Sequence, residues 1–574
     1  MVMATKTPQG ARLNPQNTLE LSQGMSIQTA INTADAHGGF WVILLYPSTT
    51  YDEGDLTTTG GALITIRGMD EHVMIAPAAA PATAVINITE TLYLENITVI
   101  SPDAAIPAVL VNTAAGAPTI TDCIIVGEGV GYSLQMTQGS VDVHRGSFSR
   151  DVHLSTLRCL LDCYFTTFHG NIITAAEPLD HDIDLMSCNM TRGNIISNAT
   201  GATVIACEGV DDIDAVTNAG TGLFTFKDCY VDSVNCTNAA GEIRVTGGTL
   251  MACGGAVGVV TWRVSTNHYE CVPGMNINHS IDAGRYIFLH PGTFTITAVV
   301  DIGVGHFTLE GSGIGVTEIQ AAADNIDCIY VHGFISEVTI KSMTLRGKIT
   351  GARNDAGIYV DNVSDLNIED IYSMSHGEEA IRLENCTSGP SLVNVTVSDS
   401  GRNAGFSNFK ATGCTYLRIT TLISKVANTT HALHLDNCSD SQLSNISLYD
   451  PNGHGIMLED CTNVTVTTAH CDGQDTAGTY GVYFLRCTGC QLIGGEAHDF
   501  EDGVRIEGDG TGNADYNTVT VVKCTSNVNG IDIVEAGAGQ SNKNIIIGNQ
   551  ILGNTTAAFV DGGTNTEQGH NIVV

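Results

Sequence analysis

The sequence predicts an all-β protein made of two tandem parallel β-helices, because a strand repeat runs through its second half and the chain's opening has a second copy. Between Gly357 and Val534 a small residue followed by a short apolar strand recurs, and successive copies are 22 to 27 residues apart. Apolar and polar residues alternate within each copy, so alternate side chains point to opposite faces. A period of this length, built from short strands without helical periodicity, is typical of a solenoid of parallel strands.

The first element is a polar segment, residues 1–24, which we interpret as an N-terminal arm that docks to other proteins. The first β-helix follows at residues 25–263. It opens with a short amphipathic helix, Ser26 to Asn32, and a buried strand that Pro47 ends. We expect the helix to cap the first coil, which would otherwise expose unpaired strand edges and an open apolar end.

The same opening returns later in the chain. Tyr286 to Leu289, followed by Pro291, repeats the buried strand and its proline, and Phe307 to Gly311 repeats the strand that follows. Pro47 and Pro291 are 244 residues apart. We therefore predict a linker at residues 264–278 and a second β-helix, with its own N-terminal cap, at residues 279–574.

The composition argues against several classes of protein. The 574 residues include 61 acidic and 24 basic ones, and the formal net charge of −37 repels phosphate and disfavours binding to nucleic acid. The longest apolar run, Phe40 to Tyr46, is too short to span a bilayer, and residues 1–16 lack the apolar segment of a signal peptide. We expect synthesis in the cytoplasm without a signal peptide, and no insertion into a membrane.

The 18 cysteines follow the spacing of the coils. Four of them, Cys386, Cys438, Cys461 and Cys487, stand five residues after the first apolar residue of their strand. At such positions a cysteine acts as a small apolar side chain that fills one inward position per coil. We predict buried, stacked thiols and no disulfide framework.

Each opening, with its short helix, its strand ending in proline and its glycine turn at Gly68 or Gly311, resembles the start of pectin-lyase-like β-helix proteins. The coils that follow resemble this superfamily over residues 25–574. The resemblance implies right-handed coils with three short parallel sheets. It also implies a choice of functions, since the superfamily includes polysaccharide lyases, glycoside hydrolases and spikes of tailed viruses.

Two short motifs resemble the polygalacturonase type of glycosidase. Gly453-His454-Gly455 is similar to its Gly-His-Gly motif, and Arg505-Ile506 is similar to the start of its Arg-Ile-Lys motif. In that family three aspartates supply the acid and the base, and this sequence lacks them at the matching positions. The acids Glu378 and Glu379 are the other candidate catalytic residues, but they precede His454 by three coils. Ordinary turns between coils explain the same residues without any catalysis.

A cluster of aspartates is the leading candidate metal site. Asp180, Asp182 and Asp184 alternate along one strand and share a face, where carboxylate oxygens could hold Ca²⁺. The competing interpretation is a solvated polar face opposite Ile183 and Leu185. No other cofactor is indicated.

These observations favour a structural protein of a tailed virus, such as a spike, turret, fibre or decoration on the virion surface. We expect it to be made in the host cytoplasm, to bind other virion proteins through the arm, and to contact host-surface polysaccharide. A homotrimer is expected by analogy with viral β-helix spikes. Two alternatives stay open: a polysaccharide-degrading lyase or glycosidase of the same superfamily, and a cellular surface adhesion solenoid. Whether the protein is an enzyme is undecided, with the balance against it.

Overall fold

The computed structural model describes most of the chain after its first 16 residues. The described residues are 17–47, 50–70, 73–114, 116–128, 131–155, 157–176, 181–198, 201, 203–254, 257–348, 355–401, 405–425, 430–474, 476–536 and 539–574. They are nearly all β, with about 3% helix, and they form a β-solenoid of about 22 turns. The chain divides into two compact units, residues 1–265 (unit 1) and 266–574 (unit 2). Neither described helix has the length and apolar composition needed to cross a membrane.

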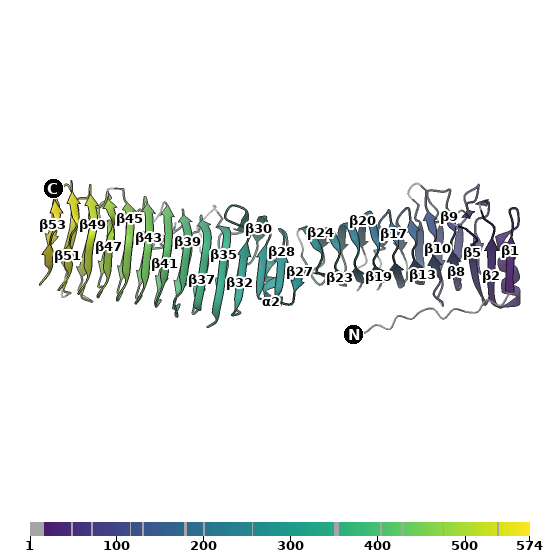
Figure 1. Cartoon of the computed structure of the whole chain (residues 1–574), viewed down its shortest axis with the longest axis horizontal. Coiled ribbons are helices and arrows are strands. Elements are labelled where there is room, and N and C mark those ends of the chain that lie inside the picture. The colour runs from purple at the N-terminus through teal and green to yellow at the C-terminus, as the bar shows by residue number, and fades with distance from the viewer. Residues whose placement is uncertain are drawn as a thin grey trace. The chain divides into compact units, whose positions relative to one another are not determined.

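Unit 1 is a stack of coils whose strands pair in parallel with the same strand of the next coil (Figure 1). Its first face contains β1 (Thr18–Leu21), β2 (Gly39–Leu45), β5 (Ala62–Gly68), β8 (Leu92–Glu95), β11 (Thr119–Thr121), β13 (Leu134–His144), β16 (Cys159–Tyr164), β19 (Asp182–Met186), β21 (Val204–Glu208), β23 (Leu223–Lys227), β25 (Glu242–Thr246) and β27 (Val259–Ser265).

The other strands of unit 1 form the remaining faces of its coils. They are β3 (Thr50–Tyr51), β4 (Leu56–Thr57), β6 (Met74–Ile75), β7 (Ile86–Ile88), β9 (Thr98–Ile100), β10 (Val109–Asn112), β12 (Ile124–Val126), β14 (Ser147–Phe148), β15 (Val152–Leu154), β17 (Thr167–Phe168), β18 (Ile172–Thr174), β20 (Asn189–Ser197), β22 (Asp211–Asn218), β24 (Tyr230–Cys236) and β26 (Thr249–Cys253).

Unit 2 has one separate sheet of 11 parallel strands. These are β31 (Val300–Ile302), β34 (Ile329–Val331), β36 (Ile358–Asp361), β38 (Ile381–Glu384), β40 (Phe409–Thr412), β42 (His431–Asp436), β44 (His454–Glu459), β46 (Tyr480–Leu485), β48 (Asp502–Gly508), β50 (Asn529–Glu535) and β53 (Ala557–Asp561).

The other strands of unit 2 make up its remaining faces. They are β28 (His268–Cys271), β29 (Tyr286–Leu289), β30 (Gly292–Ile296), β32 (Phe307–Gly311), β33 (Thr317–Ala321), β35 (Ser336–Arg346), β37 (Ser364–Met374), β39 (Ser391–Ser398), β41 (Arg418–Lys425), β43 (Gln442–Tyr449), β45 (Thr465–Asp472), β47 (Gln491–His498), β49 (Thr518–Thr525), β51 (Ile545–Ile547), β52 (Gln550–Leu552), β54 (Glu567–Gly569) and β55 (Ile572–Val573).

The long strands of unit 2 bend once, and the bend makes two faces out of one strand. In β45 the bend is at Thr468, whose φ is 54° and which is left out of the pairing with β47. Inward side chains are three residues apart across it, at Val466 and Ala469, and two residues apart after it. A left-handed residue at this position therefore turns the strand through a corner while its neighbours stay paired.

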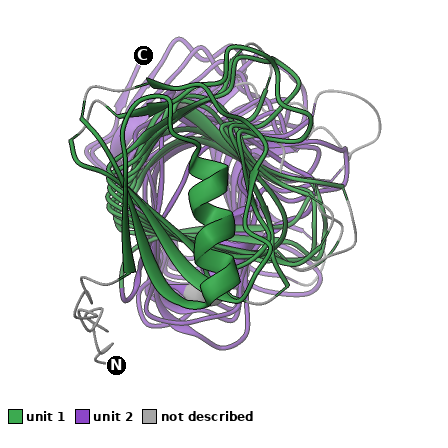
Figure 2. Ribbon diagram, turned by 90° about the vertical axis from the view of Figure 1, so that its right-hand side faces the viewer, with its two compact units in different colours: residues 1–265 green, residues 266–574 purple. Residues whose placement is uncertain are grey.

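Each unit has a short helix near its start, after one strand. In unit 1, α1 (Ile27–His37) begins after Ser26, whose hydroxyl accepts a hydrogen bond from the Thr29 N–H at 3.1 Å. Figure 2 shows α1 lying across the end of the unit 1 coils, and its face with Ile27 and Ile31 is buried. In unit 2, α2 (Ile277–Ala283) begins after Asn276 in the same way. The predicted caps are both present.

Two predicted boundaries differ from the structure. Residues 18–21, assigned to the arm, form β1, which pairs in parallel with β2 and buries Leu21. In the predicted linker, residues 268–271 form β28, which pairs with β29, and α2 begins at Ile277. Each opening thus starts one strand earlier than predicted, because a four-residue strand holds too few alternations to stand out in the sequence. Residues 1–16 of the arm lie outside the described residues.

The core consists of side chains that stack in register along the coils. All 18 cysteines are free and buried, as predicted. Burial raises the pKa of the Cys471 and Cys524 thiols to about 12, so these thiols stay protonated at neutral pH. Parallel strands joined by a full coil are right-handed in nearly all known proteins, and the fold is the right-handed parallel β-helix expected from the pectin-lyase-like resemblance.

Candidate functional site

The outer face of the 11-stranded sheet carries a row of mostly aromatic and charged side chains, with one methionine among them. Strand pairing places one such residue from each coil directly beside the next. We call this the central row, and from β34 to β50 it contains Tyr330, Tyr359, Arg382, Lys410, His434, Met457, Tyr483, Arg505 and Asp532.

Two of the predicted catalytic residues, His454 and Arg505, meet on this face through Tyr480. The His454 ring stacks on the Tyr480 ring, with centroids 4.7 Å apart and planes 7° apart, and on the His431 ring at 4.7 Å and 6°. The Arg505 guanidinium carbon lies 4.6 Å from the centre of the Tyr480 ring. The two candidates therefore belong to one stack that runs along the coils, with Tyr480 between them.

The histidines of this stack are held neutral. Burial, then Arg505 and His434, lower the pKa of His454 to about 4. Burial, then His454, His434 and Lys410, lower that of His431 to about 2. Neutral imidazoles cannot donate a proton as general acids near pH 7, so the stack offers flat rings and hydrogen-bonding ring edges.

Arg505 is neutralised by acids from its own strand and the next one. Its guanidinium donates to Glu507 at 2.8 Å, to Asp502 at 3.1 Å and to Asp532 at 3.4 Å. Burial, with a contribution from Asp502, raises the pKa of Asp532 to about 6, while Arg505 opposes the rise. Glu507 stands where the polygalacturonase motif has its lysine, and it also accepts a hydrogen bond from Tyr483 at 2.9 Å. Because its guanidinium is already paired with these acids, Arg505 holds the side chains of Asp502, Glu507 and Asp532 together on this face.

The other two catalytic candidates, Glu378 and Glu379, lie just before β38 and differ in their surroundings. Glu378 is 3.4 Å from Arg382, whereas Glu379 is 1% exposed and its Oε2 has no hydrogen-bond partner. Burial raises the pKa of Glu379 to about 7 and also raises that of Glu378. Glu379 is therefore a carboxyl that can carry a proton at neutral pH.

A buried pair lies at the same edge of the sheet, with Asp355 from the preceding coil and His376 from the same turn as Glu378. Nδ1 of His376 is 3.4 Å from Oδ2 of Asp355, and both side chains are fully buried. The other oxygen of Asp355 accepts a hydrogen bond from the Gly377 N–H at 3.0 Å, but neither ring nitrogen of His376 forms a hydrogen bond. Buried polar atoms without partners are uncommon and mark this edge as a second candidate region.

The structure keeps the two candidate regions apart. From β38 to β44 the pairing passes through β40 and β42, so Glu378 and Glu379 lie three coils from His454. Strands that pair in this way are about 4.8 Å apart per step, which places the acids too far from the ring stack to share a substrate atom.

The predicted Ca²⁺ cluster lies only partly within the described residues, because Asp180 is outside them. Asp182 and Asp184 share the outer face of β19, and Asp182 forms an ion pair with Arg158 at 2.6 Å. Asp184 stands in register with Asp162 of β16, which stands in register with Asp142 of β13. We call these three residues the aspartate ladder. The Ca²⁺ site itself stays a prediction.

The ladder perturbs its own members. Burial, followed by repulsion from Asp184, Asp142 and Asp182, raises the pKa of Asp162 to about 6. Sequence reasoning missed Asp142 and Asp162, as it missed Tyr480 and Asp532, because coils of unequal length hide which residues align. Counting each position from the buried core residue of its own coil is the signal that could have found them.

Comparisons with known proteins show similarity of structure alone. No family model matches the chain, and no curated protein matches it. Among solved structures, ORF18 of Geobacillus virus E2 is 13% identical with a TM-score of 0.32, over 51% of this chain and 56% of that one. The chain thus spans little more than half of that structure.

Two further solved structures are of proteins named as enzymes. The A-module of mannuronan C-5 epimerase AlgE4 from Azotobacter vinelandii is 15% identical with a TM-score of 0.33, over 50% of this chain and 94% of that one. The PL6 family alginate lyase AlyGC is 10% identical with a TM-score of 0.20, over 97% and 100%. At these scores the similarities carry no argument about function, which rests on the residues of this chain.

Proposed function

We propose that this protein is a structural β-solenoid of a tailed virus's surface that binds host-surface polysaccharide along the central row of unit 2. The observation that carries the binding proposal is the row itself, where three tyrosines, three cationic side chains, a histidine, a methionine and an aspartate occupy nine neighbouring strands. A sugar chain offers hydroxyl groups as donors and acceptors at regular intervals. Ring edges, guanidinium groups and carboxylates repeated once per coil match such a ligand.

Charge supports a glycan in preference to a nucleic acid. The net charge of −37 repels phosphate, and the acids around Arg505 and Arg382 compensate the cations of the row. The row is left with polar groups of both signs, which suits a neutral or weakly charged polysaccharide.

Binding is tested with purified full-length chain and a panel of host-surface polysaccharides. Tyr330 stacks on Tyr359 at 5.0 Å at one end of the row, and Lys410 is half-buried near its middle. The double variant Tyr330→Ala, Lys410→Ala should bind its polysaccharide at least about tenfold more weakly, since each lost contact is worth about 1 kcal/mol. The matched control is Tyr372→Ala on the outer face of β37, which should change affinity less than about twofold. Equal losses in both variants, or no binding by the wild type, would contradict the proposal.

Virion assembly is the second part of this proposal. It includes attachment to other virion proteins through the N-terminal arm and a homotrimer. Immuno-electron microscopy of purified particles should place the protein on the virion surface, and light scattering at micromolar concentration should give the mass of three chains. Absence of the protein from particles would leave the cellular adhesion class as the better explanation.

One observation favours the alternative function, cleavage of the bound polysaccharide. Glu379 is a buried carboxyl with an unpaired oxygen and a pKa raised to about 7 by burial, and Glu378 is the residue beside it. A protonated carboxyl beside a second acid is the arrangement that supplies a general acid in glycoside cleavage.

Product release distinguishes the two functions. If the protein is an enzyme, Glu379→Gln should reduce the release of reducing ends or unsaturated uronates at least about a hundredfold, the usual effect of losing a general acid. Glu369→Gln on the outer face of β37 is the control. Polysaccharide binding without any release by the wild type would reject the enzymatic alternative and leave the structural proposal intact.

A further inference from the structure

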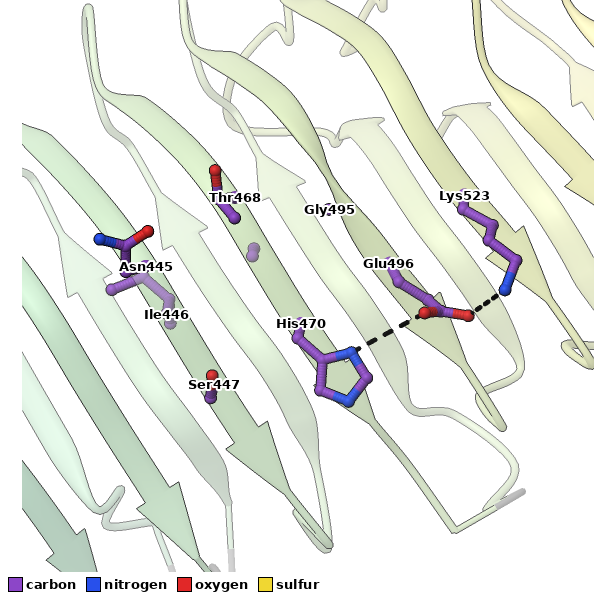
Figure 3. A pocket seen from close by; sticks show the side chains of 9 residues that line it. Asn445, Ile446, Ser447, Thr468, His470, Gly495, Glu496 and Lys523 are labelled. Carbon is purple, nitrogen blue, oxygen red and sulfur yellow. Dashed lines mark hydrogen bonds and ion pairs between the residues drawn. The ribbon is translucent and has the colours of Figure 1, made fainter.

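A groove lies on the long-strand face of unit 2, away from the 11-stranded sheet. Its volume is about 390 Å³, and its lining comes from β43, β45, β47 and β49, around the corner where these strands bend. Figure 3 shows His470, Glu496 and Lys523 on three successive strands of its wall. His470 also belongs to a cluster of four side chains that extends from the groove toward the ends of β45 and β47.

This cluster is a square of two histidines and two acids. Pairing of β45 with β47 sets His470 beside Glu496 and Asp472 beside His498. Within each strand the two residues are two positions apart and therefore point to the same face. The imidazoles occupy one diagonal and the carboxylates the other, so each histidine has an acid beside it on both sides.

Three of the four side chains converge. One ring nitrogen each of His470 and His498 and one oxygen of Asp472 lie within 4.8 Å of one another. Nδ1 of His498 is 3.4 Å from Asp472 and 3.3 Å from Asp499, the residue after the strand. The side chains of His470, Asp472 and His498 are 38%, 35% and 23% exposed, so solvent and ions reach them.

We propose that His470, Asp472 and His498 form a binding site for a divalent transition-metal ion of the Zn²⁺ type. Imidazole nitrogen with carboxylate oxygen is a ligand set that Zn²⁺ and its neighbours in the first row accept, whereas Ca²⁺ and Mg²⁺ require oxygen alone. Ligands of a metal at about 2.1 Å stand about 3.4 Å apart in a tetrahedral site. Small side-chain rotations bring the three atoms to that spacing, and a fourth position remains for Asp499 or a water molecule.

Glu496 is the fourth member of the square and lies next to His470 without being one of the three proposed ligands. Oε2 of Glu496 lies 4.0 Å from Nδ1 of His470, and Lys523 holds the other oxygen of Glu496 at 2.6 Å. At 4.0 Å this contact is longer than a hydrogen bond, and its shortening in the metal-loaded site would fix the ring and leave Nε2 for the metal. Glu496 thus serves as a positioning residue for His470, and the net negative charge of the chain favours cations near it.

The proposal is tested by metal titration of the full-length chain after treatment with chelator. Zn²⁺ should bind with one equivalent that the double variant His470→Ala, His498→Ala loses, and Asp472→Asn should weaken that binding at least tenfold. Co²⁺ in the same position should give visible absorption bands in the wild type that are absent from the double variant. His306→Ala is the matched control, because His306 is an exposed histidine 2.8 Å from Glu337, and it should leave the titration unchanged.

Other outcomes would overturn the site. Equal Zn²⁺ binding by wild type and double variant would assign the metal to other residues, and competition by Ca²⁺ at equal concentration would show that the histidines are not ligands. Thermal unfolding without metal checks that the variants fold. Because the side chains at these positions are partly exposed, the melting temperatures should stay close to that of the wild type.

Discussion

The aspartate ladder of unit 1 and the Arg486 cluster of unit 2 each join charged side chains from three successive coils, but their charge patterns are opposite. In unit 1, Asp142, Asp162 and Asp184 follow one another on three coils with no cation between them. In unit 2, Arg486 stands between coils and binds Asp460 at 2.8 Å on one side and Asp509 at 2.7 Å on the other. It also binds Glu459 at 2.6 Å.

The difference shows how register decides the electrostatics of a parallel β-helix. Each outward residue has its nearest neighbours one coil before and one coil after it, about 4.8 Å away. Where those neighbours are like charges, the pKa of the middle acid rises, as for Asp162 at about 6. In the Arg486 cluster, hydrogen bonds from His434 and Arg486 lower the pKa of Glu459 to about 2, although Glu459 is partly buried.

The largest effect is expected from removal of the central cation. Arg486→Met leaves Glu459, Asp460 and Asp509 facing one another, and Arg486 is only 15% exposed. We expect the free energy of unfolding of unit 2 to fall by about 2–3 kcal/mol at pH 7, less than for a fully buried pair. Urea unfolding measures it, and Arg418→Met, at an exposed arginine of β41, is the control with an expected change under about 0.5 kcal/mol.

The pH dependence of that loss follows from the lowered pKa. The stability that Glu459 contributes is fully present above its unfolded pKa of about 4.5 and disappears as the pH falls through about 2. The gap between wild type and Arg486→Met should therefore be widest near pH 7 and narrow below about pH 4. A gap that is constant with pH would assign the loss to packing alone.

A smaller effect of opposite sign is expected in unit 1. The raised pKa of Asp162 means that its ionisation opposes folding, so Asp162→Asn should stabilise unit 1 by about 1 kcal/mol at pH 7, after a discount for solvent screening. The gain should shrink as the pH falls from about 6 to about 4, where the folded wild type binds the proton. Hydrogen exchange of the amides of β13, β16 and β19 measures it. Asp182→Asn, which breaks the pair with Arg158, should give no gain.

The smallest effect is expected when a cation is placed between the acids of the aspartate ladder, as Arg486 is placed between acids in unit 2. Asp162→Lys puts a cation between Asp142 and Asp184, and should stabilise unit 1 by about a further 0.5 kcal/mol relative to Asp162→Asn. This increment should shrink in 1 M salt, since solvent ions reach these partly exposed charges. Thr225→Lys, which stands in register with Arg244, should give no increment. An increment that high salt leaves unchanged would exclude the electrostatic explanation.

The fold could be predicted from the sequence because each copy of the sequence repeat corresponds to one coil of the β-helix. Spacing of small and apolar residues gives the strands, and the prolines at 47 and 291 expose the duplicated opening. The strands β1 and β28 could not be predicted, because a strand of four residues has at most two inward positions, such as Tyr269 and Cys271 in β28. Helix α1 is longer than predicted, since Ala34 continues the buried face beyond Asn32.

The site could be predicted only in part. The motifs led to His454 and Arg505, but the residue that joins them, Tyr480, belongs to no motif. Alignment across coils is what places side chains together, and it depends on turns of varying length. The separation of Cys461 from Cys487 is 26 residues, and so is that of Asp472 from His498. Coils aligned on their cysteines would have revealed the histidine–carboxylate square.

The buried thiols have a consequence for how the protein can be observed. Eight of the 18 cysteines lie in unit 1 and ten in unit 2, and all are shielded from reagents in the folded chain. An alkylating reagent can modify them only when a coil opens. The rate of modification at each cysteine therefore measures how often its coil opens. The chain therefore carries natural reporters along most of its length, and mass spectrometry could show which turns loosen first and which hold longest.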